Sequence, residues 1–251
     1  MRHLKFDRPI AHRGLHDRAK GVIENTASAF DAAIAAGYHI ECNLQLTKDG
    51  EPVVFHDNEL KRLTGREGRV GDLTLAELTA LPLLDSAAGD RPQRFSELLE
   101  QVAGRTLLQV ELKHQRPSNN RLLAQKAVHA VLNYRGPLVF ESFDPELVTL
   151  VRRYGFRGPR GIITYRYDRP DRDKDLTTAQ KFYLRNLIHW PRTRFDFMSV
   201  HEESLNLPAV RFWRKRGKPV TSWTIRSRDA EHKALAGGAD QIVFEGFVPR
   251  A

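Results

Sequence analysis

The residues with the clearest chemical potential stand beside short hydrophobic stretches of the chain. They comprise two histidines, two glutamates, an asparagine, an arginine and a lysine: His12, His56, Glu41, Glu111, Asn43, Arg13 and Lys113. Carboxylate and carbonyl oxygens suit a hard cation such as Ca²⁺ or Mg²⁺, and arginine and lysine suit a phosphate group. Two imidazoles with ordinary pKa values near about 6.5 can supply one acid and one base. Together these residue types indicate metal-assisted cleavage of a phosphate ester.

The stretch 40–56, IECNLQLTKDGEPVVFH, is predicted to position three of these residues. Apolar and polar residues alternate through its first half, which predicts a strand with one face toward a core and Glu41 and Asn43 on the other. A Lys-Asp-Gly turn and a short apolar strand then lead to His56. The alternation turns Cys42 away from the polar face, so we expect it beneath a helix. An ordinary half-exposed hairpin would show the same pattern, so the rest of the chain is needed to distinguish such a hairpin from a functional site.

The rest of the chain alternates between strands and helices. We predict eight main strands, near residues 10, 41, 108, 139, 162, 198, 221 and 242, and helices that include 26–37, 119–133, 145–154, 178–189, 208–216 and 229–236. Such alternation favours parallel strands with right-handed crossovers, and eight units favour an α/β fold of the (β/α)8 TIM-barrel type. The alternative is a doubly wound sheet, but no glycine-rich phosphate loop follows the first strand.

A long connection follows the hairpin of the second strand. Residues 57–106 contain two helical stretches, at 73–78 and 95–102, with a loop at 82–92 between them. We interpret this region as a small insertion on one end of the barrel, so that 1–251 forms a single domain.

Composition narrows the classes of partner. The chain has 40 Lys and Arg against 31 Asp and Glu, a net charge of +9, which favours anionic partners. The basic residues are scattered without regular aromatic interleaving, so we expect a small-molecule phosphodiester and no nucleic acid. Cys42 is the only cysteine, which excludes an intrachain disulfide. No apolar run approaches about 18 residues, so we expect no integral membrane segment and a cytoplasmic location. A homo-oligomer is left open.

Polar residues at the carboxyl ends of barrel strands converge on one site. By this rule the fourth strand adds Ser142 and the seventh adds Trp223 as substrate-binding residues beside the histidines and glutamates. The charged loop at 165–178 follows the fifth strand, and its Arg and Asp charges nearly cancel. A solvated lid is favoured there over an anion clamp, with Tyr165 and Arg166 as candidates for contacts with the variable part of a substrate.

Several motifs resemble those of the glycerophosphodiester phosphodiesterase family. They are HRG at 12–14, ENT at 24–26, AF at 29–30, IECNLQLTKDG at 40–50, VVFHD at 53–57 and VELK at 110–113, with looser matches for SFD at 142–144 and SWTI at 222–225. The resemblance covers essentially the whole chain. It implies a barrel with an insertion at 57–106, a divalent cation (Mg²⁺ or Ca²⁺), and hydrolysis of glycerophosphodiesters to glycerol 3-phosphate and an alcohol.

The resemblance also implies roles for individual residues. His12 and His56 match the paired catalytic histidines, and Trp223 matches a residue on the alcohol side of the pocket. Positions that bind the phosphate match Arg13 and Lys113. The metal-binding carboxylates of the family match Glu41, Asn43 and Glu111.

Two positions depart from the family pattern. The family has Glu-x-Asp where this chain has Glu41-Cys42-Asn43, so one negative charge is lost and an NH2 group stands beside the remaining carbonyl oxygen. An introduced inactivating substitution, a homologue with weaker or altered metal dependence, and a non-catalytic phosphodiester-binding barrel are all compatible with Asn43. A lyase that forms a cyclic phosphate is a further alternative. The second departure is Glu245, where a substrate contact or a structural hydrogen bond is expected to differ.

Overall fold

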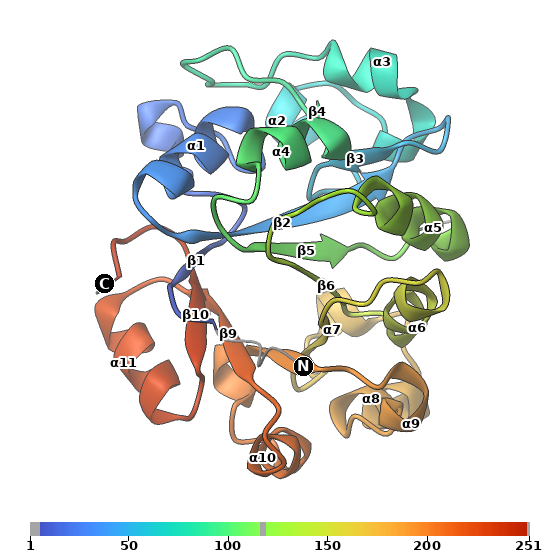
Figure 1. Ribbon diagram of the computed structural model, residues 1–251, viewed down its shortest axis with the longest axis vertical. Helices are drawn as coiled ribbons and strands as arrows, with labels where there is room; N and C mark the ends of the chain where they lie inside the picture. Colours follow the sequence, from blue (N-terminus) through green and yellow to red (C-terminus); the bar gives the residue numbers. More distant parts are fainter. Residues whose placement is uncertain (1–5, 116–118, 250–251) are drawn as a thin grey trace.

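Eight parallel strands close into a barrel in the computed structural model, which describes residues 6–115 and 119–249 (Figure 1). The strands are β1 (Ile10–Ala11), β2 (His39–Leu46), β5 (Leu108–Leu112), β6 (Leu138–Ser142), β7 (Arg160–Thr164), β8 (Phe197–His201), β9 (Val220–Ile225) and β10 (Gln241–Phe244). Strand β1 pairs in parallel with both β2 and β10, which closes the ring. The predicted (β/α)8 barrel is confirmed.

Helices surround the barrel on its outer face (Figure 1). They are α1 (Ala27–Ala35), α5 (Asn120–Ala130), α6 (Pro145–Arg153), α8 (Thr178–Arg185), α9 (Trp190–Thr193), α10 (Pro208–Lys215) and α11 (Arg228–Ala236). A further short helix, α7 (Pro170–Asp173), lies in the loop after β7. Thr26 caps α1 by accepting a hydrogen bond from the backbone N–H of Ala29. The single helix predicted at 178–189 is instead α8 followed by α9, because Leu187 between them has a positive φ of 52°. The charged loop at 166–175 contains α7, which was not predicted.

The segment from β3 (Pro52–Val54) to α4 (Phe95–Val102), which we call the cap, lies along one side of the barrel beyond β2, at the top of Figure 1. Between these two elements it contains α2 (Lys61–Thr64), α3 (Leu75–Thr79) and β4 (Gln93–Arg94). Strand β3 pairs antiparallel with β2, and β4 pairs antiparallel with β3, so the cap continues the barrel sheet. Beneath it lies a separate hydrophobic cluster that includes Ile23, Phe55 and Leu78. The single-domain organisation over 1–251 stays a prediction.

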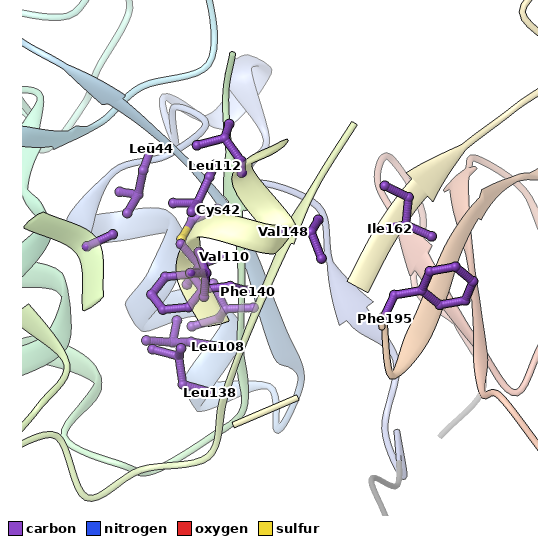
Figure 2. Packing of buried hydrophobic residues seen from close by; sticks show 14 of the residues in the cluster. Cys42, Leu44, Leu108, Val110, Leu112, Leu138, Phe140, Val148, Ile162 and Phe195 are labelled. Atoms are coloured by element: carbon purple, nitrogen blue, oxygen red, sulfur yellow. The ribbon is translucent and has the colours of Figure 1, made fainter. Parts of the chain in front are cut away.

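The alternation along β2 divides its side chains between two environments. Cys42 and Leu44 are fully buried in the main hydrophobic core with Val110 and Leu112 of the neighbouring β5 (Figure 2). Glu41 and Asn43, on the opposite face, are buried inside the barrel. A second apolar cluster contains Phe6, Ile10, Leu107, Val139, Phe197 and Val243, from the beginnings and interiors of the strands.

Candidate active site

A cavity of about 400 Å³ opens where the barrel strands end. Seven of the nine predicted site residues line it: His12, Arg13, Glu41, His56, Glu111, Lys113 and Trp223. Ten further residues complete its lining: Glu141, Phe143, Ile163, Arg169, Arg172, Ser199, His201, Thr224, Arg226 and Val243. Residues that are far apart in the sequence therefore line one cavity, as expected for side chains at the carboxyl ends of barrel strands. Asn43 and Ser142, the other two predicted residues, lie outside the lining.

His12 is oriented by a carboxylate from the other end of the chain. Its Nδ1 lies 2.5 Å from Oε2 of Glu245, the residue that follows β10. Burial lowers the pKa of His12, although the hydrogen bond from Glu245 opposes this shift. Burial would raise the pKa of Glu245, but its hydrogen bonds with His12 and His16 lower it well below the usual range. An ionised carboxylate accepts a hydrogen bond from Nδ1–H, which leaves Nε2 of a neutral imidazole as the acceptor on the cavity side.

His56 has a similar partner that is adjacent in sequence. Its Nδ1 lies 2.8 Å from Oδ1 of Asp57, and Arg62 Nε donates to the other carboxylate oxygen at 2.5 Å. Burial lowers the pKa of His56 to about 4 against the opposing effect of Asp57. Hydrogen bonds from His56 and Arg62 outweigh the burial of Asp57 and keep its pKa below the usual range. Both histidines are therefore neutral near pH 7 and carry an oriented imidazole.

Glu24 links the segment that carries His12 and Arg13 to the segment that carries His56 and Arg62. Arg62 donates two hydrogen bonds of 2.7 Å to this carboxylate, and Arg13 donates one of 2.7 Å. Burial would raise the pKa of Glu24, but the two arginines outweigh it and lower the pKa to about 2. Arg13 has a positive φ of 57°, and a Cβ on the following Gly14 would lie 2.8 Å from Cβ of Ala29. This close approach explains the glycine of the His-Arg-Gly motif.

Asn43 lies between the two glutamates that were predicted to bind a metal. Its Nδ2 donates to Oε1 of Glu41 at 2.8 Å and to Oε2 of Glu111 at 2.7 Å. Its Oδ1 points away and accepts a hydrogen bond of 3.0 Å from Nδ2 of Asn25. The backbone N–H of Asn43 in turn donates to Oδ1 of Asn25 at 3.3 Å. Because a backbone N–H can only donate, it defines the orientation of Asn25, and Asn25 then defines the orientation of the Asn43 amide.

The two glutamates have opposite pKa shifts. Burial, together with the nearby charge of Glu111, raises the pKa of Glu41 to about 8. Burial acts on Glu111 as well, but the positive charge of Lys113, whose Nζ lies 3.7 Å from Oε1, outweighs it and lowers the pKa. One carboxyl group is therefore protonated near neutral pH, and the other is ionised. The proton on Glu41 and the two amide hydrogens of Asn43 relieve the repulsion between the two side chains.

These residues do not fit the divalent cation that the sequence predicted. The oxygen of Asn43 is directed toward Asn25, and its nitrogen stands where a third ligand oxygen would be needed. Within residues 6–115 and 119–249, no group of three or more His, Cys, Asp or Glu side chains is arranged to bind a metal ion. Two carboxylates bridged by an amide nitrogen offer a hard cation too few oxygens.

The structure uses Ser142 differently from the prediction. Its Oγ donates to the carbonyl oxygen of Leu112 at 2.7 Å and accepts from the backbone N–H of Asp144 at 3.0 Å. With both hydroxyl functions satisfied and the side chain buried, Ser142 supports the end of β6 and does not contact the cavity. Arg166 is likewise absent from the lining, whereas Tyr165 packs against Trp223, which does line it.

Several residues that line the cavity or contact its lining were missed or undervalued from sequence. Glu245 was noted only as a departure from a motif, although it directly follows a strand and the strand-end rule applies to it. Glu141 lies on the inner face of β6, where Gln109 donates to it at 3.0 Å and burial raises its pKa well above the usual range. Arg169 and Arg172 come from the loop after β7, whose sequence has no hydrophobic periodicity from which their positions could be predicted.

Comparison with known proteins identifies the family. The family model described as "Glycerophosphoryl diester phosphodiesterase family" matches residues 12–245. The chain belongs to this family. A curated glycerophosphodiester phosphodiesterase from Caldanaerobacter subterraneus subsp. tengcongensis is 27% identical over 94% of this chain and 93% of its own length. One from Bacillus subtilis is 23% identical over 93% of this chain and 81% of its own length. The predicted family is confirmed, and the chain is a phosphodiesterase of this family.

Solved structures share the barrel of this phosphodiesterase. An Oleispira antarctica phosphodiesterase in complex with the product sn-glycerol-3-phosphate superposes with a TM-score of 0.79 at 22% identity, covering 96% of this chain and 93% of that chain. The glycerophosphodiester phosphodiesterase from Thermotoga maritima gives a TM-score of 0.70 at 23% identity, with 97% and 96% coverage. At these identities the likeness concerns the fold alone. No helix in the described residues of the phosphodiesterase combines the length and apolar character needed to cross a bilayer.

Proposed function

We propose that this phosphodiesterase hydrolyses glycerophosphodiesters to glycerol 3-phosphate and an alcohol in the cavity at the carboxyl ends of the barrel strands. The observation that carries the proposal is the pair of imidazoles, His12 and His56, each held by a carboxylate at Nδ1 and each lining the same cavity. Arg13 and Lys113 lie beside them. The product in the Oleispira antarctica relative supports the same choice of substrate.

The two histidines divide the proton transfers. Nε2 of His12 removes the proton from the attacking oxygen, and the Glu245 carboxylate stabilises the imidazolium that forms. The attacking oxygen is that of water, or that of the neighbouring glycerol hydroxyl, which gives a cyclic phosphate that water then opens. His56 protonates the leaving alcohol. Its low pKa in the free protein means that the anionic phosphate must raise it on binding, as an opposite charge at short range does. Arg13 and Lys113 neutralise the charge that builds on the phosphate oxygens.

Mg²⁺ or Ca²⁺ is the cofactor that the resemblance implies, but the Asn43 amide gives the carboxylate pair hydrogen bonds in place of a third charged ligand. We infer that Glu41 and Glu111 alone bind a divalent cation poorly. The proton transfers above depend on the histidines and do not require the amide to change its orientation.

Phosphorus NMR of glycerophosphoglycerol incubated with the protein tests the proposal. The expected product is a phosphate monoester, glycerol 3-phosphate, and a double variant with His12→Ala and His56→Ala should form none. A stable cyclic phosphate as the only product would instead identify a lyase. No reaction together with ligand-dependent thermal stabilisation would identify a non-catalytic binding barrel. The cytoplasmic location, the absence of nucleic-acid binding and a homo-oligomeric state stay predictions.

A further inference from the structure

Three aromatic rings surround one guanidinium at the cavity. The centre of the Arg172 guanidinium lies 4.4 Å from the ring centroid of Phe143, 4.9 Å from that of Tyr165 and 5.6 Å from that of Trp223. All three distances lie within the range of about 6 Å at which a cation is attracted to a ring face. We call Phe143, Tyr165 and Trp223 the aromatic cage.

The three rings of the aromatic cage pack directly against one another. Its rings pack edge to face, with centroids 5.5 Å apart for Phe143 and Trp223, 6.0 Å for Phe143 and Tyr165, and 6.5 Å for Tyr165 and Trp223. The rings come from three segments of the chain: the residue after β6, the residue after β7, and β9. Such a set of rings is the arrangement that recognises quaternary ammonium groups in other proteins. Here a cation of the chain itself occupies it.

The segment that carries Arg172 is held in place by the neighbouring residue, Asp173. Asp173 is fully buried, and its carboxylate accepts hydrogen bonds from the Tyr165 hydroxyl and, at 2.8 Å, from the backbone N–H of Arg169. These bonds tie the short helix α7 to a residue of the cage. The position of Arg172 is therefore set by its buried neighbour, although Arg172 itself is exposed at the cavity it lines.

Arg172 differs from the other arginines contributed by the loops around the cavity. Arg226 pairs with Glu245 at 2.7 Å, and Arg169 lies 3.7 Å from Glu203. Across residues 6–115 and 119–249, Arg172 forms no ion pair with a carboxylate, and its contacts are the three ring faces. Ring faces attract the charge but accept few of the five guanidinium hydrogens. Those hydrogens are available to an oxyanion in the cavity.

From these contacts we propose that Arg172 is a specificity-determining residue that selects phosphodiesters whose alcohol carries a second anionic group, a carboxylate or a phosphate ester. This inference rests on the proposed function of the cavity. A cationic alcohol such as choline is disfavoured for two reasons: its natural site is already filled by Arg172, and the two positive charges repel each other. A guanidinium matches carboxylate and phosphate oxygens in a two-pronged geometry that neutral alcohols lack.

Two matched substrate pairs test this selectivity. Glycerophosphoserine and glycerophosphoethanolamine differ by one carboxylate, and glycerophosphoinositol 4-phosphate and glycerophosphoinositol differ by one phosphate ester. We expect kcat/KM to favour the anionic member by about 5- to 20-fold in at least one pair, the range of a partly exposed charge-assisted contact. The pair with the larger ratio identifies the anionic group. Glycerophosphocholine should be the poorest substrate.

Variants then assign the effect to one residue. Arg172→Gln should bring the ratio of kcat/KM between the anionic member and the other member of each pair below about 2-fold. The variant should also cleave glycerophosphocholine faster relative to the anionic substrates. The control is Lys174→Gln, which removes the same charge two residues away, from an exposed side chain outside the cavity lining. It should leave the ratio unchanged. Ratios near 1 in both pairs, or equal ratios in wild type and Arg172→Gln, would overturn the proposal.

A binding measurement separates this proposal from the proposed hydrolysis. Calorimetric titration of His56→Ala with the same four compounds gives dissociation constants that need no turnover. If the protein cleaves nothing but binds the anionic members more tightly through Arg172, the hydrolysis fails and the selectivity holds. If it cleaves all four compounds equally and binds them equally, the hydrolysis holds and the selectivity fails.

Discussion

Asn25 and Asn43 hold each other by reciprocal hydrogen bonds, one from the Asn43 backbone N–H to Oδ1 of Asn25 and one from Nδ2 of Asn25 to Oδ1 of Asn43. Asn25 has a positive φ of 57° and is almost completely buried. Its position directs the nitrogen of Asn43 toward Glu41 and Glu111. Asn43 thus contributes no negative charge between the two glutamates and directs hydrogen-bond donors toward both of them.

Asn43→Asp should restore a third carboxylate. Without the two amide donors, Glu41, Glu111 and the new aspartate repel one another, and a divalent cation relieves that repulsion. We expect Mg²⁺ or Ca²⁺ affinity to rise by at least about 10–100-fold, the loss typical of removing a supporting metal interaction. Calorimetric titration measures affinity directly, and turnover with and without chelator measures its consequence. Asn43→Ala, which removes the amide without adding a charge, is the control. Equal affinities in wild type and Asn43→Asp would contradict the expectation.

Glu245→Gln should slow turnover by changing the orientation and basicity of His12. The carboxylate at 2.5 Å raises the pKa of His12 against the effect of burial. Its neutralisation should therefore lower that pKa further and move the acidic limb of the kcat/KM profile to lower pH. We expect a loss of about 10²-fold, at the low end of general acid–base contributions. Glu100→Gln, on the exposed surface of α4, should change neither quantity. A rate loss without a shift of the pH profile would indicate a purely structural role for Glu245.

Much of this site followed from the sequence because strand ends in a barrel share one edge. Alternation along β2 and β5 was enough to place Glu41 and Glu111 on the inner face, and the position of Cys42 in the outer core follows from the same alternation. Short elements such as α2, α7 and β4 were not predicted. They have too few residues to show a hydrophobic period, and their formation depends on contacts with the barrel.

The missed chemistry depends on contacts that sequence spacing does not reveal. Ser142 stands at a strand end, but a backbone carbonyl of the adjacent strand satisfies its hydroxyl. The direction of the Asn43 amide requires Asn25, from a segment 18 residues earlier in the chain. The charges around 166–175 nearly cancel in sequence, yet the fold buries Asp173 and places Arg172 at the cavity. Local charge counts do not show which side chain of this loop is buried and which lies at the cavity.

His56→Ala and His12→Ala should respond differently to the leaving group. If His56 protonates the leaving oxygen, its loss should cost about 10²–10⁴-fold with an alkyl leaving group. The loss should be far smaller with p-nitrophenol, which departs without protonation. His12→Ala should lose a similar factor with both, because the attacking oxygen must be deprotonated in either case. Initial rates with glycerophosphoglycerol and with a p-nitrophenyl phosphodiester provide the comparison. The reverse pattern would exchange the two roles, and unchanged rates in both variants would exclude the histidines from the chemistry.

Glu24→Gln should destabilise the protein in a pH-dependent way. The pKa of Glu24 falls from 4.5 to about 2 in the folded state because Arg62 and Arg13 outweigh its burial. A carboxyl group with a depressed folded pKa stabilises the fold above the unfolded value, and the effect is lost as pH falls from about 4.5 toward about 2. We expect Glu24→Gln to lower the free energy of unfolding by about 1–3 kcal/mol at pH 7, as for lost hydrogen bonds to a charged group.

Urea unfolding of wild type and Glu24→Gln at pH 7, 5, 4 and 3 measures this dependence. The difference in unfolding free energy should be nearly constant between pH 7 and pH 5 and should shrink below about pH 4.5, because the unfolded wild-type chain then binds a proton at Glu24 that the folded protein, with a pKa of about 2, does not bind. Glu100→Gln, which removes a carboxylate from the exposed surface of α4, should show no such change. A difference at pH 3 that is as large as at pH 7 would mean that packing around Glu24, and not its ion pairs with Arg62 and Arg13, stabilises this part of the site.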